Sequence, residues 1–415
     1  YGYEYGRNRL VEKLPTGQVL IFWNKMEKKI LIVNPGSASK KYSFYVDGKE
    51  VLRAHFESEN GGFVVSWGSD KVNEKKNITE FDFKKSAAIV LARLKEAGIM
   101  ADAGEIHSVG FRTVAAGDYF LETRFIDEEF LKQLAGAEDR APLHVSALHL
   151  ELREFAIILP ETKKYAVSDS TFYKERPDYS KNYGLPYSLA KELQMFRFGY
   201  HGISGASIAR RAPLVLGNLP SRVVVCHLGS GISIIGIKDG KGIDASMGFT
   251  PLEGTMMSTR VGNIDPGALI HLIKRKGFSP DELNTFLNKK CGLLGLSEIS
   301  DDMRELLKKE AEGDLSAKRA IDTFVYQIKK QVGSLIAVLG GIDSLIFTAT
   351  MGERSNIIRE RVCAGLEGLG IKINKAKNDE AIGTDGVISE EGSAVLVAVI
   401  KTDEMREMFE DVNRF

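Results

Sequence analysis

Two small-residue turns have the composition of phosphate-binding loops. The segment Asn34-Pro-Gly-Ser-Ala-Ser39 follows an apolar run, and Gly229-Ser-Gly231 follows another. Glycine and serine suit turns in which the backbone approaches an anion, because they add little bulk and expose N–H and hydroxyl donors. Either turn alone is compatible with an ordinary hairpin. The occurrence of both predicts two phosphate-binding loops that face one cleft.

The two turns belong to a repeated plan. Each is followed by a second strand-like segment and then by an Asp-Gly dipeptide, Asp47-Gly48 in the first copy and Asp239-Gly240 in the second. This dipeptide favours a tight hairpin turn. The repetition therefore indicates two similar domains that face one another.

Domain limits follow from this repeat. We expect an N-terminal domain over residues 26–170, with a terminal helix near 402–415 that packs back on it, and a C-terminal domain over 171–401. Residues 1–25 are rich in Tyr, Arg and Lys and precede Met26. We interpret them as a leader, either an artificial addition or a genuine extension.

Apolar periodicity predicts a mixed α/β chain. The helical spacing of apolar residues over residues 83–97 stops at Gly98, which is typical of a helix C-cap. The predicted helices cover residues 83–97, 298–310 and 317–339, and the predicted strands cover residues 30–33, 43–46, 51–56, 108–112, 165–167, 222–227, 232–237, 345–348 and 395–400.

Composition excludes several classes of protein. Lys+Arg and Asp+Glu both number 56, so the formal net charge is zero and no general basic field is available for nucleic acid or an anionic membrane. The sequence has no apolar run of the ~18 residues that cross a bilayer. Its three cysteines, Cys226, Cys291 and Cys363, have no metal-ligand spacing and are expected to be reduced, buried thiols. We therefore expect a cytoplasmic protein without a nucleic-acid or membrane partner.

From Lys29 to the C-terminus, the sequence resembles acetate kinase and its short-chain acyl kinase relatives. The motifs that carry the resemblance occur in the family's order and spacing. They are Asn34 to Ser39 with Lys41, Gly110-Phe-Arg112, Ala141-Pro-Leu-His144, Gly199-Tyr-His201, His227-Leu-Gly-Ser-Gly231, Asp244 to Gly248, Thr250-Pro-Leu-Glu-Gly254, Thr259-Arg260 through Asp265-Pro266, Gly292 to Gly295 and Asp302-Met-Arg304.

This resemblance implies an α/β fold of two actin-like (ribonuclease H-like) domains that arose by internal duplication, with the ligand cleft between them. It also implies phosphoryl transfer between a polyphosphate donor and a short-chain carboxylate. Such a reaction needs in-line positioning and neutralisation of charge rather than covalent help from the protein. Family members are homodimers, so a homodimer is the implied assembly.

The resemblance assigns four catalytic residues. Arg112 and Arg260 match the arginines directed at the substrate carboxylate and the transferring phosphoryl, and a guanidinium suits both anions because it is a rigid, permanently charged fork. His201 matches the histidine that donates to the phosphoryl group, and its ring could also carry charge near pH 7. Asp169 completes the set. For His144 and His227 the structural and functional interpretations stay equal.

A magnesium ion, or Mn²⁺ in its place, is also implied by the resemblance. Asp169 and Glu404 match the carboxylates around the ion, and Asn34 is the third implied ligand. Asp169 directly follows a predicted strand, where ligand sites of α/β proteins collect. Glu404 rests on the resemblance and could equally cap the terminal helix. Mg²⁺ is commonly held by one or two carboxylates together with waters and substrate phosphates.

The remaining site residues are implied in the same way. Pocket size decides acid specificity only weakly, because one methylene is worth ~1–3 kcal/mol. The implied acyl pocket is Arg112, Val114, Leu143, Tyr200 and Pro251, and the implied donor site is Asn34, Ser37, Ser39, Lys41, His227, Gly229, Ser230, Gly231, Asp302, Met303, Arg304, Thr350, Met351 and Arg354.

Several positions depart from the ATP-using pattern. Ser230 stands where Asn is usual, Thr350 where Gly lets adenine lie against the backbone, and Arg354 where Asn is usual. Similar changes mark the pyrophosphate-linked acetate kinase subgroup, and they predict a narrowed or filled adenosine pocket. On the acceptor side, Tyr200 replaces Phe and Gly205 replaces a His, and Phe111 and Ala115 replace two histidines that flank Arg112.

Three functions are weighed. The leading one is an acetate kinase-like enzyme that uses ATP and Mg²⁺, and the second uses pyrophosphate as the donor. The third is a non-catalytic actin-like binding protein, which the joint retention of Arg112, Asp169, His201, Arg260 and Glu404 argues against. A sugar kinase is disfavoured, because two arginines prepared for an anion would be poorly used on a neutral hydroxyl.

Overall fold

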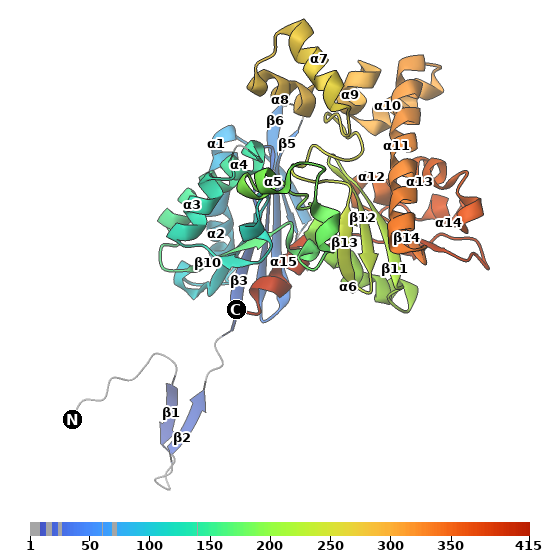
Figure 1. Cartoon of the computed structure of the whole chain (residues 1–415). Coiled ribbons are helices and arrows are strands. Elements are labelled where there is room, and N and C mark those ends of the chain that lie inside the picture. The colour runs from blue at the N-terminus through green and yellow to red at the C-terminus, as the bar shows by residue number, and fades with distance from the viewer. Residues whose placement is uncertain (1–8, 14–18, 24–26, 60, 69–72, 139) are drawn as a thin grey trace. The chain divides into compact units, whose positions relative to one another are not determined.

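The computed structural model describes residues 9–13, 19–23, 27–59, 61–68, 73–138 and 140–415 (Figure 1). The chain divides into two compact units. Unit 1 holds the described residues up to Gly110 together with Glu151–Lys164, and unit 2 holds Phe111–Leu150 and Tyr165–Phe415. The domain limits expected from the repeat remain a prediction. Part of the expected leader, including Met26, lies outside the described residues.

Unit 1 is built on an antiparallel meander with the order β7-β6-β5-β4-β3. Buried apolar residues of β3, such as Leu31 and Ile32, alternate between its two faces. The elements are β1 (Arg9–Lys13), β2 (Val19–Trp23), β3 (Lys29–Asn34), β4 (Ser39–Val46), β5 (Lys49–Glu59), β6 (Gly62–Gly68), β7 (Asn73–Ile78), α1 (Glu80–Lys84), α2 (Ser86–Glu96) and η1 (Ala103–Glu105). Strands β1 and β2 pair with each other.

Three elements pass from one unit into the other: β8 (Ser108–Thr113), α4 (Pro142–Ile158) and β10 (Lys163–Ser168). The ends of β8 and β10 lie side by side in unit 2, where the Asp169 backbone N–H donates to the Thr113 carbonyl at 2.9 Å. Two residues that the sequence analysis singled out, Arg112 and Asp169, are thereby brought to neighbouring strand ends.

Unit 2 contains a six-stranded sheet with the order β13-β12-β11-β14-β16-β15, in which β11, β14 and β16 are parallel. The strands of this sheet are β11 (Arg222–Leu228), β12 (Ile232–Lys238), β13 (Lys241–Ala245), β14 (Ser344–Thr348), β15 (Gly386–Val387) and β16 (Leu396–Val399). Unit 2 also contains β9 (Arg124–Phe125), which pairs with β10.

Its helices are η2 (Asp118–Phe120), α3 (Glu128–Ala135), η3 (Thr171–Tyr173), η4 (Asp178–Lys181), α5 (Tyr187–Glu192), α6 (Gly202–Leu216), α7 (Pro266–Lys276), α8 (Pro280–Lys289), α9 (Gly292–Ser297), α10 (Met303–Ala311), α11 (Leu315–Leu339), α12 (Ala349–Arg354), α13 (Asn356–Cys363), η5 (Glu367–Leu369), α14 (Lys375–Glu380) and α15 (Glu404–Val412). None of the helices among these described residues is long and apolar enough to cross a bilayer.

Strand β11 reads as an unbroken apolar run because helices cover both faces of its sheet. Val224 and Cys226 pack in the core formed with α11, whereas Val223 and Val225 pack in the core formed with α6 (Figure 1). All three cysteines are free, and burial raises the pKa of the Cys226 thiol. The prediction of unpaired thiols is thus confirmed, whereas the prediction of burial holds for Cys226 and Cys363 but not for Cys291, which is only partly buried.

The repeated plan is present in both units. β3 and β4 form an antiparallel hairpin, as do β11 and β12. The following turns have the same backbone, with φ of 47° and 83° at Asp47-Gly48 and 51° and 80° at Asp239-Gly240. Positive φ at both central residues is the turn type that matches the twist of a hairpin.

Two predicted helices have different limits. The segment predicted over residues 83–97 is divided at Lys85, where ψ of 18° ends α1, and α1 itself begins earlier because Thr79 and Asp82 form a capping box. The segment predicted over residues 298–310 begins only at Met303, because Glu298 has a left-handed φ of 56° that ends α9. The C-terminal helix, α15, packs against α6, and Phe415 stacks on Tyr165.

A buried arginine links the last helices of unit 2. Arg359 is fully buried, and its guanidinium donates to the Gly352, Asn378 and Ala381 carbonyls at 2.9, 2.8 and 2.9 Å.

We predict that Arg359→Ala lowers the free energy of unfolding by about 3 kcal/mol or more, because buried acceptors lose their donor. Urea denaturation would measure it. Arg361→Ala on the same helix is the control, because Arg361 pairs with Glu310 and its side chain is 34% exposed. Equal effects of the two substitutions would contradict the account.

Candidate active site

The site is organised around an ion pair at the ends of β8 and β10. Arg112 Nη2 lies 3.0 Å from Asp169 Oδ2, and Arg112 Nη1 lies 3.9 Å from Glu404 Oε2, at the start of α15. The Asp169 side chain is 1% exposed. Burial alone would lower the pKa of the Arg112 guanidinium, but the Asp169 and Glu404 carboxylates outweigh it and raise that pKa. Arg112 is therefore a permanent, pre-oriented cation.

The same aspartate fixes His201. The His201 backbone N–H donates to Asp169 Oδ2 at 2.7 Å, and the next N–H, of Gly202, donates to the Asp169 carbonyl at 2.8 Å. His201 has a left-handed φ of 55°, an unfavourable backbone for a residue with a Cβ. The two hydrogen bonds stabilise this conformation and set where α6 begins.

Two histidine rings stack beside this ion pair. The centroids of His201 and His227 are 4.1 Å apart with an interplanar angle of 17°. The Nδ1 atom of His201 is 2.8 Å from Ser233 Oγ, and the Nδ1 atom of His227 is 2.8 Å from Ser204 Oγ. Both serines are fully buried, and sequence reasoning missed them.

The histidines are neutral near pH 7. Burial first, and then the charges of Arg112 and Arg260, lower the pKa of His201 well below its ordinary value. Burial and the adjacent His201 likewise lower the pKa of His227. A charged His201 at neutral pH, considered in the sequence analysis, is therefore disfavoured. Its ring can still donate one hydrogen bond from Nε2 when the Ser233 hydroxyl donates to Nδ1.

Arg260 lines a cavity of about 310 Å³ in unit 2. Its Nη1 donates to the Pro251 carbonyl at 3.2 Å, and burial lowers its pKa. Arg140, His144, Pro251 and Leu252 also line the cavity. Burial and the charges of Arg260 and Arg112 lower the pKa of His144 to about 4. The cavity thus offers fixed cations beside a neutral imidazole, a suitable lining for a carboxylate.

Other residues of the predicted acyl pocket are placed differently. Val114 and Tyr200 are buried in the core formed with α11 rather than on the walls of this cavity. The Tyr200 hydroxyl donates to the Phe249 carbonyl at 2.8 Å, so it is satisfied away from Arg112. Leu143 lies in α4, and its side chain is outside the described residues.

The acceptor-side departures have local explanations. A Cβ on Gly205 would lie 2.9 Å from the Phe172 ring, so α6 has no room for a side chain there. Phe111 and Ala115 are buried, so they pack in the interior on either side of Arg112.

The carboxylates fit a divalent cation. Asp169 Oδ2 is occupied by Arg112 and His201, whereas Asp169 Oδ1 is buried and has no hydrogen-bond partner among the described residues. Glu404 lies near the same guanidinium. The described residues contain no cluster of three or more His, Cys, Asp or Glu side chains that could enclose a metal by themselves. An ion would therefore take only one or two protein carboxylates here, as Mg²⁺ usually does.

The second small-residue turn lies against His201. A Cβ on Gly231 would come within 3.1 Å of His201 Cε1 and 3.6 Å of Arg260 Nη1. The turn is closed by a hydrogen bond from the Gly229 N–H to the Gly231 carbonyl at 3.1 Å, and the Ser230 side chain is exposed. The structure thus brings Gly231, His201 and Arg260 together.

The segment Thr348 to Arg354 follows β14. Thr350 and Arg354 are exposed, whereas Met351 packs against the core. The two departures from the ATP-using pattern therefore lie at the surface rather than inside a closed pocket. Glu353 Oε1 accepts the Ala349 N–H at 3.0 Å and the Thr402 N–H at 3.3 Å, which joins this segment to the residues before Glu404. No sequence signal pointed to Glu353.

The third donor segment begins α10. Asp302 is its N-cap and accepts the Arg304 N–H at 2.8 Å, while its carboxylate also pairs with the Arg304 guanidinium. Arg304 is 91% exposed and Met303 is buried. Of these three residues, Arg304 is thus the one most available to a ligand.

The first small-residue turn belongs to unit 1. Asn34 ends β3 opposite Lys41 of β4, and Ser37 is exposed between them. A Cβ on Gly36 would lie 2.6 Å from the Ser39 carbonyl oxygen, so the turn requires glycine. Ser39 Oγ lies 2.8 Å from His55 Nε2 of β5.

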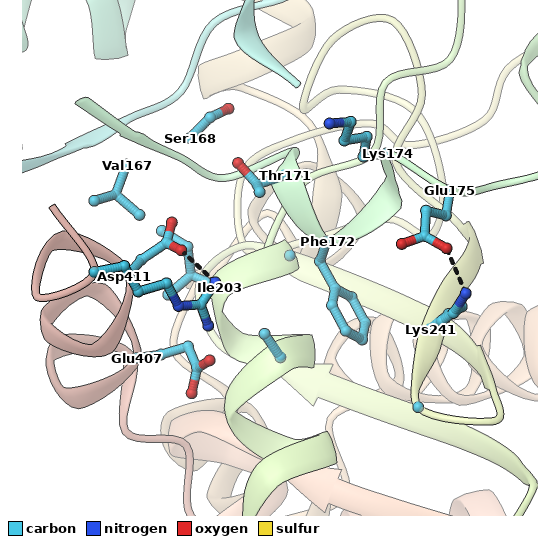
Figure 2. A pocket seen from close by; sticks show the side chains of 14 residues that line it. Val167, Ser168, Thr171, Phe172, Lys174, Glu175, Ile203, Lys241, Glu407 and Asp411 are labelled. Atoms are coloured by element: carbon cyan, nitrogen blue, oxygen red, sulfur yellow. Dashed lines mark hydrogen bonds and ion pairs between the residues drawn. The ribbon is translucent and has the colours of Figure 1, made fainter. Parts of the chain in front are cut away.

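A separate cavity of about 470 Å³ lies beside α6 and α15 (Figure 2). Phe172 and Ile203 form part of its wall, and Asp411 pairs with Arg414 at its edge at 3.2 Å. This cavity shares no lining residue with the Arg260 cavity, so the two are distinct. None of the residues predicted for the site lines it.

The chain was compared with known proteins. The sequence profile of the Acetokinase family matches residues 29–409. An acetate kinase of Clostridium botulinum (strain Kyoto / Type A2) is 39% identical over 383 residues, which are 91% of this chain and 96% of the relative. An acetate kinase of Thermotoga petrophila is 37% identical over 386 residues, with the same coverage of 91% and 96%.

Solved structures agree with these relatives. The crystal structure of Porphyromonas gingivalis acetate kinase has a TM-score of 0.82 and 32% identity, covering 93% of this chain and 99% of that one. A propionate kinase from Francisella tularensis has a TM-score of 0.83 and 31% identity, covering 92% and 98%. The predicted α/β, actin-like fold class is confirmed. This chain belongs to the acetokinase family, whose members are phosphotransferases with a carboxyl group as acceptor.

Proposed function

We propose that this chain catalyses reversible transfer of a phosphoryl group between ATP and a short-chain carboxylate, with acetate as the expected acid, to give an acyl phosphate. The observation that carries the proposal is the partly buried Arg112 held between the buried Asp169 and Glu404, beside a neutral His201. Such a cluster places a fixed positive charge where an anion must be bound and its developing charge stabilised.

Arg112 and Arg260 are the proposed anion-binding groups. A guanidinium can hold a carboxylate through two parallel hydrogen bonds, which orients the attacking oxygen. The resemblance proposes Val114, Leu143, Tyr200 and Pro251 as the pocket for the acyl chain, and of these Pro251 lines the Arg260 cavity. Because one methylene is worth only ~1–3 kcal/mol in such a pocket, this set favours short-chain acids as a class.

The transferring phosphoryl group is proposed to meet the acid near His201. Phosphoryl transfer proceeds in line and spreads charge over the equatorial oxygens, so donors directed at those oxygens lower the barrier. The neutral His201 ring would donate from Nε2, and the two arginines would supply permanent charge. No residue of the chain has to form a covalent intermediate.

Asp169, Glu404 and Asn34 are the proposed ligands of Mg²⁺, or of Mn²⁺ in its place. Asp169 Oδ1 is suited to this role because it is buried without another partner among the described residues. When bound, the cation would neutralise charge on the donor phosphates. Its placement on Asp169 leaves Oδ2 to orient Arg112 and His201.

The donor phosphates are proposed to bind the two small-residue turns. Backbone N–H groups and hydroxyls of such turns bind phosphate whatever base follows it. The proposed phosphate ligands are Asn34, Ser37, Ser39, Lys41, His227, Gly229, Ser230 and Gly231, and the proposed adenosine contacts are Asp302, Met303, Arg304, Thr350, Met351 and Arg354.

Pyrophosphate is the second candidate donor. The exposed Thr350 and Arg354 replace the residues that the ATP-using pattern places around adenosine, whereas both small-residue turns are present, the second with Ser230 in place of Asn. Recognition of the base should therefore be weaker than recognition of the phosphates. A homodimeric assembly and a cytoplasmic location complete the proposal.

The first functional prediction concerns the reaction. Purified protein with Mg²⁺ and acetate or propionate is expected to form an acyl phosphate that hydroxylamine traps as a coloured hydroxamate, and to form the donor from acetyl phosphate in reverse. ATP, GTP and pyrophosphate would each be supplied as donor. Folded protein that gives no hydroxamate with any of the three would leave the non-catalytic alternative standing.

The second prediction concerns fixed charge. Arg112→Ala and Arg260→Ala should each lower kcat by ~10²–10³-fold or more, because each removes a preorganised cation from an anionic transition state. His201→Ala should have a smaller effect, because a neutral hydrogen-bond donor is lost. Arg275→Ala on exposed α7 is the control. Near-native kcat in either site variant, with an unchanged circular dichroism spectrum, would remove that arginine from the site.

The third prediction concerns the base. Calorimetric titration should show weak, poorly selective binding of ATP and GTP to the wild type, and tighter ATP binding to the Thr350→Gly/Arg354→Asn double variant. Pyrophosphate affinity should be equal in both proteins, which makes it the internal control. Tight, adenine-selective binding by the wild type that the variant does not improve would show that these two residues do not limit base recognition.

A further inference from the structure

One face of the unit 1 sheet carries a histidine that the proposed function does not use. His55 of β5 lies directly opposite Lys41 of β4 and Ser66 of β6, and Ser66 lies opposite Lys75 of β7. Directly paired residues of antiparallel strands share a face of the sheet. His55 therefore belongs to the same face as Lys41, one of the proposed phosphate ligands.

The His55 ring contacts Ser39, another of the proposed phosphate ligands. His55 Nε2 lies 2.8 Å from Ser39 Oγ and 3.4 Å from Glu57 Oε2. Its side chain is 31% exposed, so a ligand at the turn could approach this group. Ser39 opens β4 directly after the turn that contains Gly36 and Ser37.

We propose that His55 is a positioning residue of the donor site, which directs the hydroxyl proton of Ser39 toward a phosphate oxygen. The proposal deepens the proposed function and rests on its assignment of Ser39 and Lys41 to the donor phosphates. The ligand class is a di- or triphosphate, with inorganic pyrophosphate as its smallest member.

The hydrogen-bond roles follow from the chemistry of the two groups. A serine hydroxyl has one proton, so it either donates to His55 Nε2 or accepts from it. When Nε2 carries a proton, Ser39 Oγ accepts, and the Ser39 proton is free to point at a ligand. When Nε2 is bare, the Ser39 proton is used on the ring. A bound phosphate oxygen therefore favours the state in which Nε2 is protonated.

The surrounding charges set the direction of the pH effect. Burial first, and then the positive charges of Lys41 and Lys75, lower the pKa of His55, while Glu57 opposes them. Lys75 is itself paired with Glu59. A phosphate dianion would offset the two lysines and raise the pKa of His55. Since binding then takes up a proton, phosphate affinity should rise as the pH falls through the pKa of the complex, by at most about tenfold per pH unit for one proton.

Two substitutions separate orientation from simple packing. His55→Gln can still donate an amide N–H to Ser39 but does not titrate. His55→Ala removes the donor altogether. A purely structural histidine would give a change in affinity that is the same at every pH, whereas a positioning histidine changes the pH profile itself.

The experiment is calorimetric titration of inorganic pyrophosphate with Mg²⁺ into the full chain at pH 6, 7 and 8. The wild type, His55→Gln, His55→Ala and the control His271→Gln, which alters an exposed histidine of α7, would be compared. Protonation of pyrophosphate itself is common to all four proteins, so differences between their pH profiles report on the protein.

We expect the wild type and the control to gain several-fold more affinity between pH 8 and pH 6 than either His55 variant. His55→Gln should bind more tightly than His55→Ala at pH 8. Parallel pH profiles of the wild type and His55→Gln would overturn the inference while leaving the proposed function intact. Absence of pyrophosphate binding by the wild type, together with absence of acyl phosphate formation, would overturn both.

Discussion

The ion pair between Arg112 and Asp169 is the contact on which the rest of the site depends. Asp169 is almost wholly buried, and removing one partner of a buried pair typically costs ~3–5 kcal/mol, because a charge is left without compensation. The same carboxylate oxygen accepts the His201 N–H and so sets the left-handed residue at which α6 begins. One aspartate thus positions a cation, an imidazole and a helix. Its other oxygen remains available to a metal ion.

Two kinds of group set the electrostatics of the candidate site: permanently charged guanidinium groups and neutral imidazole rings. Arg112 and Arg260 remain cations at any accessible pH, and their charges help to keep His201 and His144 neutral. A neutral imidazole can donate a hydrogen bond without adding charge to a site that already holds two guanidinium groups. Buried serines, Ser233 and Ser204, hold the Nδ1 atoms of the stacked histidines. An anion bound as proposed would therefore meet permanent charge and an oriented neutral donor.

Sequence reasoning predicted the parts of the fold that have strong periodicity or turn signals. The apolar runs of β3 and β11 and both Asp-Gly hairpins are such parts. Strand β7 was missed because its side chains are almost all exposed and show no apolar alternation. The helix limits at Lys85 and Glu298 were wrong because each depends on the backbone conformation of one residue, which composition does not encode.

The candidate site could likewise be predicted only in part from the sequence. Arg112, Asp169 and His201 are far apart in the chain, and only the family resemblance pointed to their association. The supporting contacts of Ser233, Glu353 and His55 were missed, because common residue types gain these roles through strand register and tertiary packing. Their partners are given by hydrogen bonds in the folded chain.

The central claim is that a carboxylate oxygen attacks the phosphorus of the donor. The most direct test uses acetate labelled with ¹⁸O in both oxygens, with hydroxylamine present to cleave the acyl phosphate at its carbonyl carbon. With ATP as donor, a carboxylate that attacks phosphorus leaves its bridging ¹⁸O on the phosphate, and ³¹P NMR will show inorganic phosphate with one ¹⁸O per molecule; with pyrophosphate as donor, an equal amount of unlabelled phosphate will accompany it. Phosphate that contains only ¹⁶O would mean that water attacks the donor, and it would contradict the account.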